Sequence, residues 1–329
     1  MTKYLLVGYG SIGRRHMNNL LAHGERDIVV LRSNKSTLDT GALKDFPVET
    51  DLRAALAHKP DAAIIATPTS LHMDTAIPAA ELGAHLLLEK PVSHSLDRTD
   101  DLARAAAESG SRIVTAYQFR WHPTLNALKE ELDRGTIGRI TSAHVEGGEF
   151  MPGWHPWEDY RNSYAALPEL GGGVVLTLCH PFDYLRWLLG EVKSVYALTS
   201  RSGLGLEVED TADALLNFQA GAQAHVHVDY LRREPRHRLE MVGSDGILTW
   251  DNATGALRIF RADTGTWQET MPPADFERNV MFMDEMAHFI QVVNNTAAPR
   301  CTYQDGIAAL KICLAVLESG KTGKEIQLG

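Results

Sequence analysis

Short apolar runs alternate with helix-like segments over the first 120 residues of the chain. Successive positions within each run are apolar, which is typical of strands covered on both faces. The five runs lie at 4–7, 28–31, 62–66, 85–88 and 113–116. Between them, apolar positions recur at helical spacing over 11–23, 51–58, 70–83 and 96–109. This alternation predicts a doubly wound α/β domain, with a parallel sheet, in residues 1–120.

From about residue 140 the pattern changes to long segments of alternating polarity. Around 225–230, valines and a tyrosine alternate with histidines and an aspartate, which is typical of a sheet with one solvent-exposed face. Further strands are expected at 139–149, 192–201, 209–219, 223–233, 237–243 and 256–261, and helices near 173–189, 277–294 and 305–318. We therefore predict an α+β domain over 121–329. Its sheet is large, open and mostly antiparallel, and its helices pack on that sheet or return to the first domain.

The composition fits two water-soluble domains in a reducing compartment. The 329 residues are 44% hydrophobic and 22% charged, enough to bury a core without disulfides. The three cysteines, Cys179, Cys301 and Cys313, cannot form a disulfide framework. No apolar run approaches the ~18 residues needed to span a membrane, and the start lacks the basic region of a secretory signal. We expect a cytoplasmic protein.

The net charge of −10 is unevenly placed along the chain. Residues 1–120 carry 14 basic and 14 acidic side chains, whereas residues 121–329 carry 18 and 28. Neither part has the basic excess that binding to a phosphate backbone requires. Nucleic acid and anionic membrane surfaces are therefore not expected as partners.

A glycine-rich turn follows the first predicted strand and opens the first helix. In such a turn one glycine permits the bend, the next lets the backbone approach a pyrophosphate, and the third allows close helix–strand packing. The helix N-terminus adds free N–H groups for the phosphates. We predict a dinucleotide site that includes Gly8, Tyr9, Gly10, Ser11, Ile12 and Gly13. The alternative is a glycine-rich turn without a ligand.

The end of the second predicted strand distinguishes between two forms of the dinucleotide. The acidic residue that would hold a ribose 2′-hydroxyl is missing, and Arg32 and Ser33 stand there instead. A guanidinium and a hydroxyl can both donate to a 2′-phosphate. This favours NADP, with NAD remaining possible. The alternative is that Arg32 lies in a solvated loop.

Three further motifs follow in order. They are Ala-Thr-Pro-Thr-Ser-Leu-His at 66–72, Glu89-Lys90-Pro91 after the fourth predicted strand, and a glycine run at 171–173 followed by His180. With the first glycine turn, this series resembles the glucose–fructose oxidoreductase / inositol dehydrogenase / MocA family along nearly the whole chain. The resemblance implies a nicotinamide-dependent oxidoreductase that acts on a secondary alcohol or ketone of a sugar, cyclitol or sugar derivative. It also implies homodimers or homotetramers built through the open sheet.

The resemblance carries roles onto particular residues. Lys90 matches the lysine that touches the nicotinamide ribose and the substrate hydroxyl, and the peptide bond before Pro91 is often cis in the family. His180 matches the catalytic histidine. The residues that match the loop flanking the nicotinamide side are Thr67, Pro68 and His72, and Glu89 is a further candidate for the cofactor site.

One position departs from the family pattern. Many members have an aspartate four residues before the histidine, where this chain has Leu176. Asp183, one turn beyond His180, lies on roughly the same helical face and is a candidate for substrate contact. The departure keeps open a cofactor-binding regulatory protein without turnover. A redox-assisted lyase or glycoside hydrolase on the same scaffold is a further alternative.

Alcohol oxidation needs a group that removes the hydroxyl proton while hydride leaves carbon. Such a base works best when its pKa lies near the working pH. Histidine meets this at about 6.5 without perturbation, whereas lysine starts near 10.4. We therefore predict His180 as the base and Lys90 as a donor that stabilises the developing alkoxide. The reverse assignment stays open because the two groups can titrate as a pair.

Further candidates surround this chemistry. Gln118 and Arg120 follow the fifth predicted strand, where ligands of open α/β sheets gather. Gln118 is a candidate for the cofactor and Arg120 for the substrate. An aromatic and polar loop supplies three more candidates for a sugar ring, Trp157, Tyr160 and Arg161. No metal site is expected, since His225 and His227 alternate on one strand without a convincing third ligand.

Overall fold

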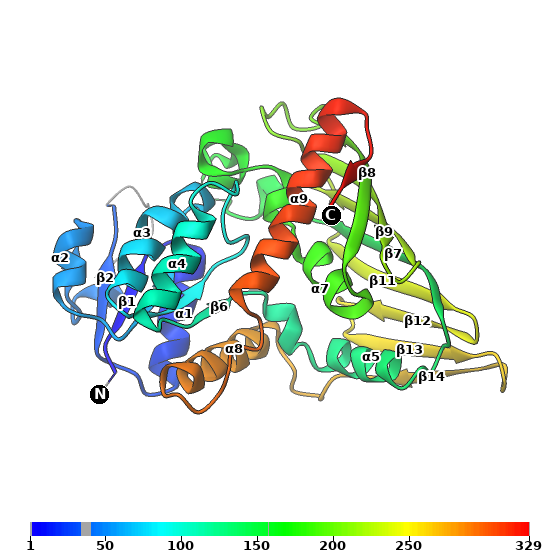
Figure 1. Cartoon of the computed structure of the whole chain (residues 1–329), viewed down its shortest axis with the longest axis horizontal. Helices are drawn as coiled ribbons and strands as arrows, with labels where there is room; N and C mark the ends of the chain where they lie inside the picture. Colours follow the sequence, from blue (N-terminus) through cyan, green and yellow to red (C-terminus); the bar gives the residue numbers. More distant parts are fainter. Residues whose placement is uncertain (1, 34–40, 157, 329) are drawn as a thin grey trace. The chain divides into compact units, whose positions relative to one another are not determined.

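The computed structural model describes residues 2–33, 41–156 and 158–328. Contacts divide the chain into two compact units (Figure 1). The first, which we call the nucleotide unit, comprises Met1–Gln118 and Arg278–Ile307, and the second, the sheet unit, comprises Phe119–Glu277 and Ala308–Gly329. The sequence pattern divided the chain after residue 120, whereas the contacts add the returning segment to the first unit.

The nucleotide unit is built on a parallel sheet of six strands in the order β3-β2-β1-β4-β5-β6. The strands are β1 Tyr4–Val7, β2 Ile28–Leu31, β3 Val48–Glu49, β4 Ala62–Ile65, β5 His85–Leu88 and β6 Ile113–Thr115. The helices are α1 Ser11–Ala22, α2 Leu52–Ala57, α3 His72–Glu81, α4 Thr99–Ser109 and α8 Arg278–Val293. The crossover from β1 to β2 through α1 and the crossover from β4 to β5 through α3 run in opposite directions along the sheet. Because both are right-handed, α1 and α3 cover opposite faces. This confirms the predicted doubly wound fold.

The strands of this sheet end level with one another. Val7 is the register partner of both Leu31 and Ile65, Ile65 pairs with Leu88, and Leu88 pairs with Thr115. Both faces of the sheet are buried, in agreement with the continuous apolar runs of its strands. The loops that follow them therefore leave the sheet at a common edge.

The sheet unit contains nine strands in the order β14-β13-β12-β11-β7-β10-β9-β8-β15. They are β7 Ile140–Gly148, β8 Val192–Ser200, β9 Thr211–Phe218, β10 Gln223–Asp229, β11 Arg236–Gly243, β12 Gly246–Asp251, β13 Ala256–Arg261, β14 Thr266–Thr270 and β15 Ile326–Gln327. All neighbouring pairs are antiparallel except β7 with β10. This confirms the predicted large and mostly antiparallel sheet.

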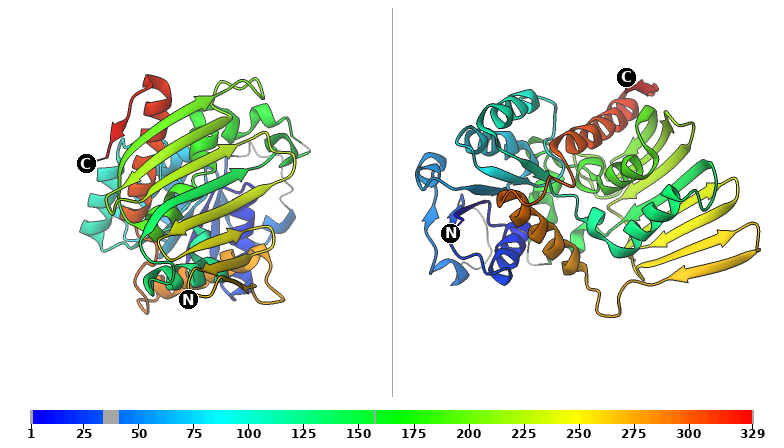
Figure 2. Two further views of the ribbon diagram at one scale, coloured as in Figure 1. Left: turned by 90° about the vertical axis from the view of Figure 1, so that its right-hand side faces the viewer. Right: turned by 60° about the horizontal axis from the view of Figure 1, so that its bottom comes forward.

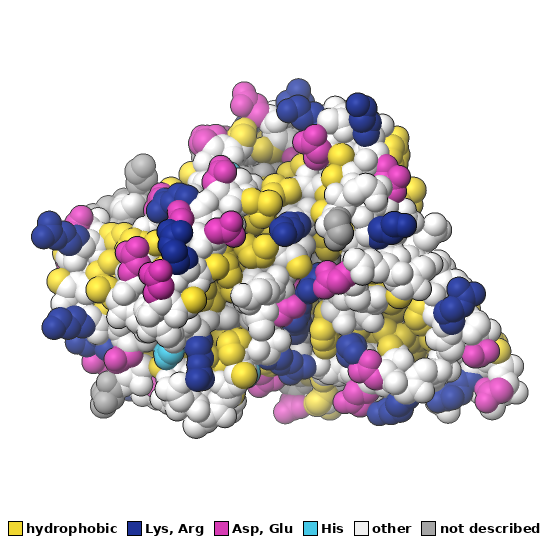
Figure 3. Space-filling model, viewed as in Figure 1, with side chains coloured by type: hydrophobic (Ala, Val, Ile, Leu, Met, Phe, Trp, Pro, Cys, Tyr) yellow, Lys and Arg dark blue, Asp and Glu magenta, His cyan; other side chains and the backbone are white. Residues whose placement is uncertain are grey.

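Helices cover one face of this sheet. They are α5 Pro123–Asp133, α6 Val174–Thr177, α7 His180–Leu189 and the larger part of α9 Tyr303–Thr322. Inward side chains such as Trp250, Tyr230 and Phe182 are fully buried, whereas the described residues leave the other face open (Figure 2). Side chains of both charge signs are interspersed over the surface seen in Figure 3.

Three strands and one helix of the sheet unit were not predicted. Strand β12 begins directly at a glycine turn, so its pattern is not separate from the turn signal. Strand β14 is exposed at every position and has no apolar face, and β15 has only two residues. Helix α5 begins at Pro123, a favoured first helical residue. In addition, the helix predicted at 173–189 is divided into α6 and α7, because Pro181 cannot donate a helical hydrogen bond to an earlier turn.

Candidate functional site

The glycine turn after β1 has the close contacts that a dinucleotide site requires. Gly8 has a φ of +95°, and a Cβ there would lie 2.5 Å from the Ala66 carbonyl oxygen. A Cβ on Gly13 would lie 2.0 Å from the Gly8 oxygen, so α1 packs directly on the turn. Gly10, at the N-cap of α1, has open space where its Cβ would stand. The turn therefore leaves room for a ligand at Gly10 while Gly8 and Gly13 fix its shape.

The other predicted cofactor residues follow the carboxyl ends of neighbouring strands. Arg32 and Ser33 follow β2, Thr67 and Pro68 follow β4, Glu89 and Lys90 follow β5, and Gln118 lies three residues beyond β6. Because these strands end in register, the loops lie along the edge where open α/β sheets bind ligands. The buried Arg32 Nε has no hydrogen-bond partner among the described protein atoms. These residues fit a dinucleotide.

A buried ion pair supports the loop that carries Lys90. Glu89 Oε1 lies 2.7 Å from Nε2 of His16 on α1, and Glu89 Oε2 accepts a 3.2 Å hydrogen bond from the Lys90 backbone N–H. Burial opposes ionisation of Glu89, but the hydrogen bond from His16 and the charges of His16 and Lys90 outweigh it and hold its pKa below the usual range. The Lys90–Pro91 peptide bond is cis.

His72 connects two of these loops. Its Nε2 lies 3.0 Å from the Thr67 carbonyl oxygen, and its Nδ1 lies 3.2 Å from that of Val92. Burial lowers the pKa of His72, and a neutral imidazole has one N–H, so it donates to one carbonyl at a time. The ring of His72 thus lies between the loops after β4 and β5 and donates to a carbonyl of one of them at a time.

In the sheet unit, His180 is the first residue of α7 and lies close to aromatic side chains. Its ring meets that of Phe119 edge to face, with the centroids 4.9 Å apart. The ring of His237, on the inward face of β11, meets Phe119 at the same centroid distance. Nε2 of His237 also lies 3.0 Å from the Tyr184 hydroxyl. The sequence did not single out His237, although an inward polar residue at the start of an alternating strand was the available signal.

Two predicted substrate residues contact each other. Arg120 Nε and Nη2 donate to the two carboxylate oxygens of Asp183 at 3.1 and 2.7 Å, and both side chains are almost fully buried. Breaking such a buried pair by removing one partner costs about 3–5 kcal/mol. The pair fixes the first turn of α7, which begins at His180.

The aromatic loop is partly described. The Tyr160 hydroxyl donates to the Leu204 carbonyl at 3.3 Å, and the Arg161 guanidinium lies 5.0 Å from the Tyr160 ring centroid. Trp157 lies outside the described residues. Leu176, the position of the family aspartate, is a buried residue of α6.

A carboxyl group that the sequence did not single out lies beside α6. Glu209 accepts a 3.0 Å hydrogen bond from the Val175 backbone N–H, and a Cβ on Gly173 would lie 2.4 Å from its Oε1. Burial raises the pKa of Glu209 to about 7. Its closeness to the glycine run explains why Gly173 has no side chain.

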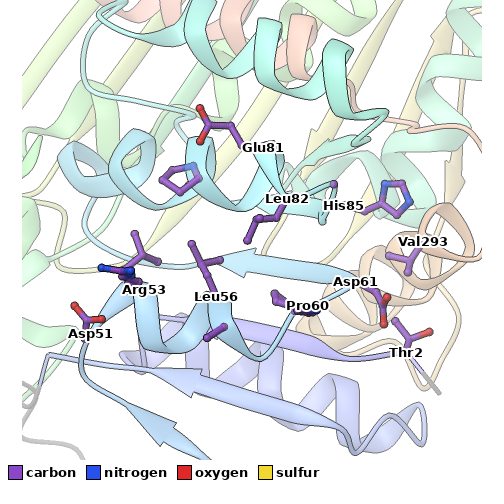
Figure 4. A pocket seen from close by; sticks show the side chains of 15 residues that line it. Thr2, Asp51, Arg53, Leu56, Pro60, Asp61, Glu81, Leu82, His85 and Val293 are labelled. Carbon is purple, nitrogen blue, oxygen red and sulfur yellow. The ribbon is translucent and has the colours of Figure 1, made fainter.

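The nucleotide unit also has a groove away from the glycine turn. This groove, of about 1300 Å³, is lined by residues that include Leu56, Pro60, Asp61, Leu82 and His85 (Figure 4). Asp61 and His85 stand at the amino ends of β4 and β5, opposite the edge where such sheets bind ligands. We therefore do not assign the cofactor to this groove.

No group of three or more His, Cys, Asp or Glu side chains in 2–33, 41–156 and 158–328 is placed to hold a metal ion. Within the same ranges, no helix combines the length and apolarity needed to cross a membrane.

Comparisons with known proteins agree along the chain. Residues 2–117 match the family of oxidoreductases with an NAD-binding Rossmann fold, and residues 125–249 match the GFO/IDH/MocA C-terminal domain. A 1,5-anhydro-D-fructose reductase of Ensifer adhaerens is 28% identical over 82% of this chain and 80% of its own. A D-xylose 1-dehydrogenase (NADP(+)) of Haloferax volcanii is 24% identical over 98% of both.

A solved structure is similar to this chain over its whole length. The WlbA dehydrogenase of Bordetella pertussis, in complex with NADH and UDP-GlcNAcA, has a TM-score of 0.84 and 26% identity over 100% of this chain and 99% of its own.

The contacts of the glycine turn predict different effects for Gly13 and Gly10. Gly13→Ala places a methyl group against the Gly8 backbone and should lower the free energy of unfolding by about 1–3 kcal/mol or more. Gly10→Ala has open space and an allowed φ, so its unfolding temperature should stay within a degree or two of the wild type, at ~0.5 kcal/mol or less. It should nevertheless bind the reduced dinucleotide at least about tenfold more weakly, a loss of ~1.4 kcal/mol.

Thermal unfolding and a fluorescence titration of reduced cofactor measure the two effects. Gly110→Ala, at an exposed turn of the same unit, controls for loss of a glycine in the cofactor titration, while its φ of +77° should lower its own unfolding temperature. Equal cofactor affinity in Gly10→Ala and the wild type would show that the ligand does not approach this turn.

Proposed function

The chain belongs to the GFO/IDH/MocA oxidoreductase family, and from this premise we propose that it moves a hydride between NADP and a secondary alcohol or ketone of a sugar, cyclitol or sugar derivative. The observation that carries the proposal is the common edge at which the glycine turn, Thr67-Pro68 and Glu89-Lys90 leave the parallel sheet. A phosphate cradle and a lysine supported by a buried carboxylate suit a dinucleotide and a reacting hydroxyl.

The preference for NADP rests on Arg32. No acidic residue follows β2 among the described residues there, and the buried Arg32 Nε has no protein acceptor in the same part of the structure. A 2′-phosphate would supply that acceptor. The relatives include a dehydrogenase named for NADP(+) and a structure with NADH, so NAD is the alternative.

The proposed mechanism divides the proton chemistry between two residues. When bound, the nicotinamide ring supplies the hydride acceptor for alcohol oxidation. An imidazole nitrogen of His180 takes the hydroxyl proton, because histidine accepts protons near neutral pH. The Lys90 ammonium donates to the same oxygen and stabilises the charge that develops on it. The Arg120–Asp183 pair holds the turn that carries His180.

Leu176 supports a second candidate function, a regulatory protein that binds the cofactor without turnover. A buried leucine at this position leaves α6 without the carboxylate found in many members. A regulatory protein that binds the dinucleotide without turnover would tolerate this change. A redox-assisted lyase or glycoside hydrolase would also show no net reduction of the cofactor, because it reoxidises the cofactor within each turnover.

We also propose that the open face of the nine-stranded sheet joins two copies of the chain. Tyr196, Leu198 and Leu215 are exposed on this face, and Leu215 pairs with Tyr196 across β8 and β9. A neighbouring polar network includes His225 and His227, both bonded to Asp213. An apolar patch with a polar margin is typical of a protein interface.

Lys90→Met and His180→Ala should each lower kcat by about 10²–10⁴-fold in a panel of polyols, inositols, aldoses and sugar nucleotides, because each removes a proton-handling group. In His180→Ala, cofactor affinity should stay near the wild-type value and the fall in rate at acidic pH should disappear. If the two residues serve one step, the double variant should be hardly slower than the slower single variant.

Nicotinamide absorbance measures these rates, and Lys44→Met, at an exposed lysine of the nucleotide unit, is the control. Wild-type turnover that survives in His180→Ala would remove this histidine from the chemistry. Tight cofactor binding without turnover on any substrate would favour the regulatory, lyase and hydrolase functions.

Arg32→Ala should weaken NADPH binding by about 10- to 100-fold and leave NADH binding nearly unchanged, since a charge-assisted hydrogen bond contributes ~1.5–3 kcal/mol. Fluorescence titration with both reduced cofactors measures the ratio, with the exposed Arg26→Ala as control. If the wild type binds NADH more tightly than NADPH, the assignment of Arg32 to a 2′-phosphate is wrong.

Replacing Leu198 and Leu215 together with Glu should shift the molar mass in solution toward that of one chain, because like charges would face each other across the interface. Light scattering after size exclusion measures this. Leu82→Glu, at an exposed leucine of the nucleotide unit, should leave the mass unchanged. A wild type that is already monomeric at all concentrations contradicts the proposal.

A further inference from the structure

The nucleotide unit buries a second carboxyl group that the proposed chemistry does not use. Glu285 lies within α8, which contacts α1 and β5. Its side chain is fully buried, and neither carboxyl oxygen has a hydrogen-bond partner among the described protein atoms. Burial, followed by the negative charge of Glu89, raises the pKa of Glu285 well above its usual range.

Glu89 is in the opposite state. His16 and the Lys90 backbone bind its two oxygens at 2.7 and 3.2 Å, and these contacts favour the carboxylate. Two carboxyl groups that act on each other in a buried place do not ionise together at neutral pH, and their environments decide which one keeps the proton. Here the hydrogen bonds assign the charge to Glu89 and the proton to Glu285.

The other charged groups around the pair fit this division. On α1, the Arg15 guanidinium lies 4.4 Å from the Phe282 ring centroid. Burial and the charge of Arg278 lower the pKa of Arg15, and the negative charge of Glu89 opposes that fall. On α3, burial lowers the pKa of His72, and the negative charge of Glu89 opposes that fall. Burial raises the pKa of the neighbouring carboxyl group on α8, Asp284, and the charge of His23 opposes that rise. The charge that acts on the pKa of Glu285 is that of Glu89.

We propose that Glu285 is a positioning residue of the cofactor site, held as a neutral acid so that Glu89 is the single buried anion that supports the Lys90 loop. This inference rests on the proposed function in one respect, namely that the dinucleotide binds along the Glu89–Lys90 edge. When the pH rises past its raised pKa, Glu285 ionises and adds a second buried negative charge. That charge repels Glu89 and the pyrophosphate, so affinity for the dinucleotide falls.

The protonated state of Glu285 has a consequence for stability that does not depend on any cofactor. In the unfolded chain a glutamate titrates near about 4.3, so above that pH the unfolded state binds one proton fewer than the folded state. This contribution to stability is fully present below the unfolded pKa and is lost as the pH rises toward the folded pKa. One proton corresponds to a tenfold change in the unfolding constant per pH unit.

Denaturant unfolding of the full chain between pH 5 and 9 measures this slope. Glu285→Gln has nearly the same shape and is always neutral. The ratio of the wild-type unfolding constant to that of Glu285→Gln should therefore grow about tenfold per pH unit above the unfolded pKa. Glu108→Gln, at an exposed site of the same unit, should retain the wild-type slope. A wild-type slope in Glu285→Gln would overturn the proposal.

Titration with reduced cofactor over the same pH range tests the role in binding. Reduced cofactor carries no charge on its ring, so its affinity reports the negative charge of the site. Affinity should fall toward alkaline pH in the wild type and in Glu108→Gln, and this fall should be absent in Glu285→Gln. A variant weakened equally at every pH would show a merely structural role and overturn the proposal.

Two outcomes separate this inference from the proposed function. If the wild type binds no reduced cofactor while the stability slope depends on Glu285, the dinucleotide site is wrong and the positioning role falls with it. If Glu285→Gln does not fold, the infrared spectrum of Glu209→Gln decides, because burial raises the pKa of Glu209 to about 7 and its protonated carboxyl would absorb in the same region. The Glu209→Gln spectrum should still contain the C=O stretch of a protonated carboxyl at pH 7, and absence of that band would overturn the proposal.

Discussion

The common edge of the parallel sheet is the constraint on which the cofactor site depends. Val7, Leu31, Ile65, Leu88 and Thr115 are linked through the register of neighbouring strands, so the loops after them start at the same level. Backbone hydrogen bonding of the sheet thus brings together residues far apart in the sequence. The buried Glu89–His16 pair and the ring of His72 then connect these loops, so that the glycine turn and Lys90 are held by the same buried core.

The sheet unit positions its chemistry differently, through a helix N-terminus. Pro181 ends the preceding helical turn and makes His180 the first residue of α7. The Arg120–Asp183 pair and the ring of Phe119 then fix this turn. Asp183, the carboxylate nearest in sequence to His180 in a chain that has Leu176 at the family position, is therefore engaged with an arginine. Glu209, held against the glycine run, is a further carboxyl group next to α6.

The sequence predicted what depends on local pattern. The alternating apolar runs gave the fold class, and the glycine turn and the Glu89-Lys90-Pro91 motif follow the strands where expected. What it could not predict depends on tertiary contacts. The pairing of Arg120 with Asp183 joins residues 63 positions apart, and the burial of Glu285 depends on α8 returning to the first unit. His237 and Glu209 lacked a local signal strong enough to separate them from ordinary strand and loop residues.

The central claim is that hydride passes directly between a substrate carbon and the nicotinamide ring while protein groups handle the proton. The most direct measurement uses a substrate deuterated at the reacting carbon, with the deuterium content of the reduced cofactor determined by mass spectrometry. The account predicts one deuterium in the nicotinamide ring for each substrate molecule oxidised, with no exchange into solvent. A reduced cofactor without deuterium, or deuterium lost to water during turnover, would contradict it.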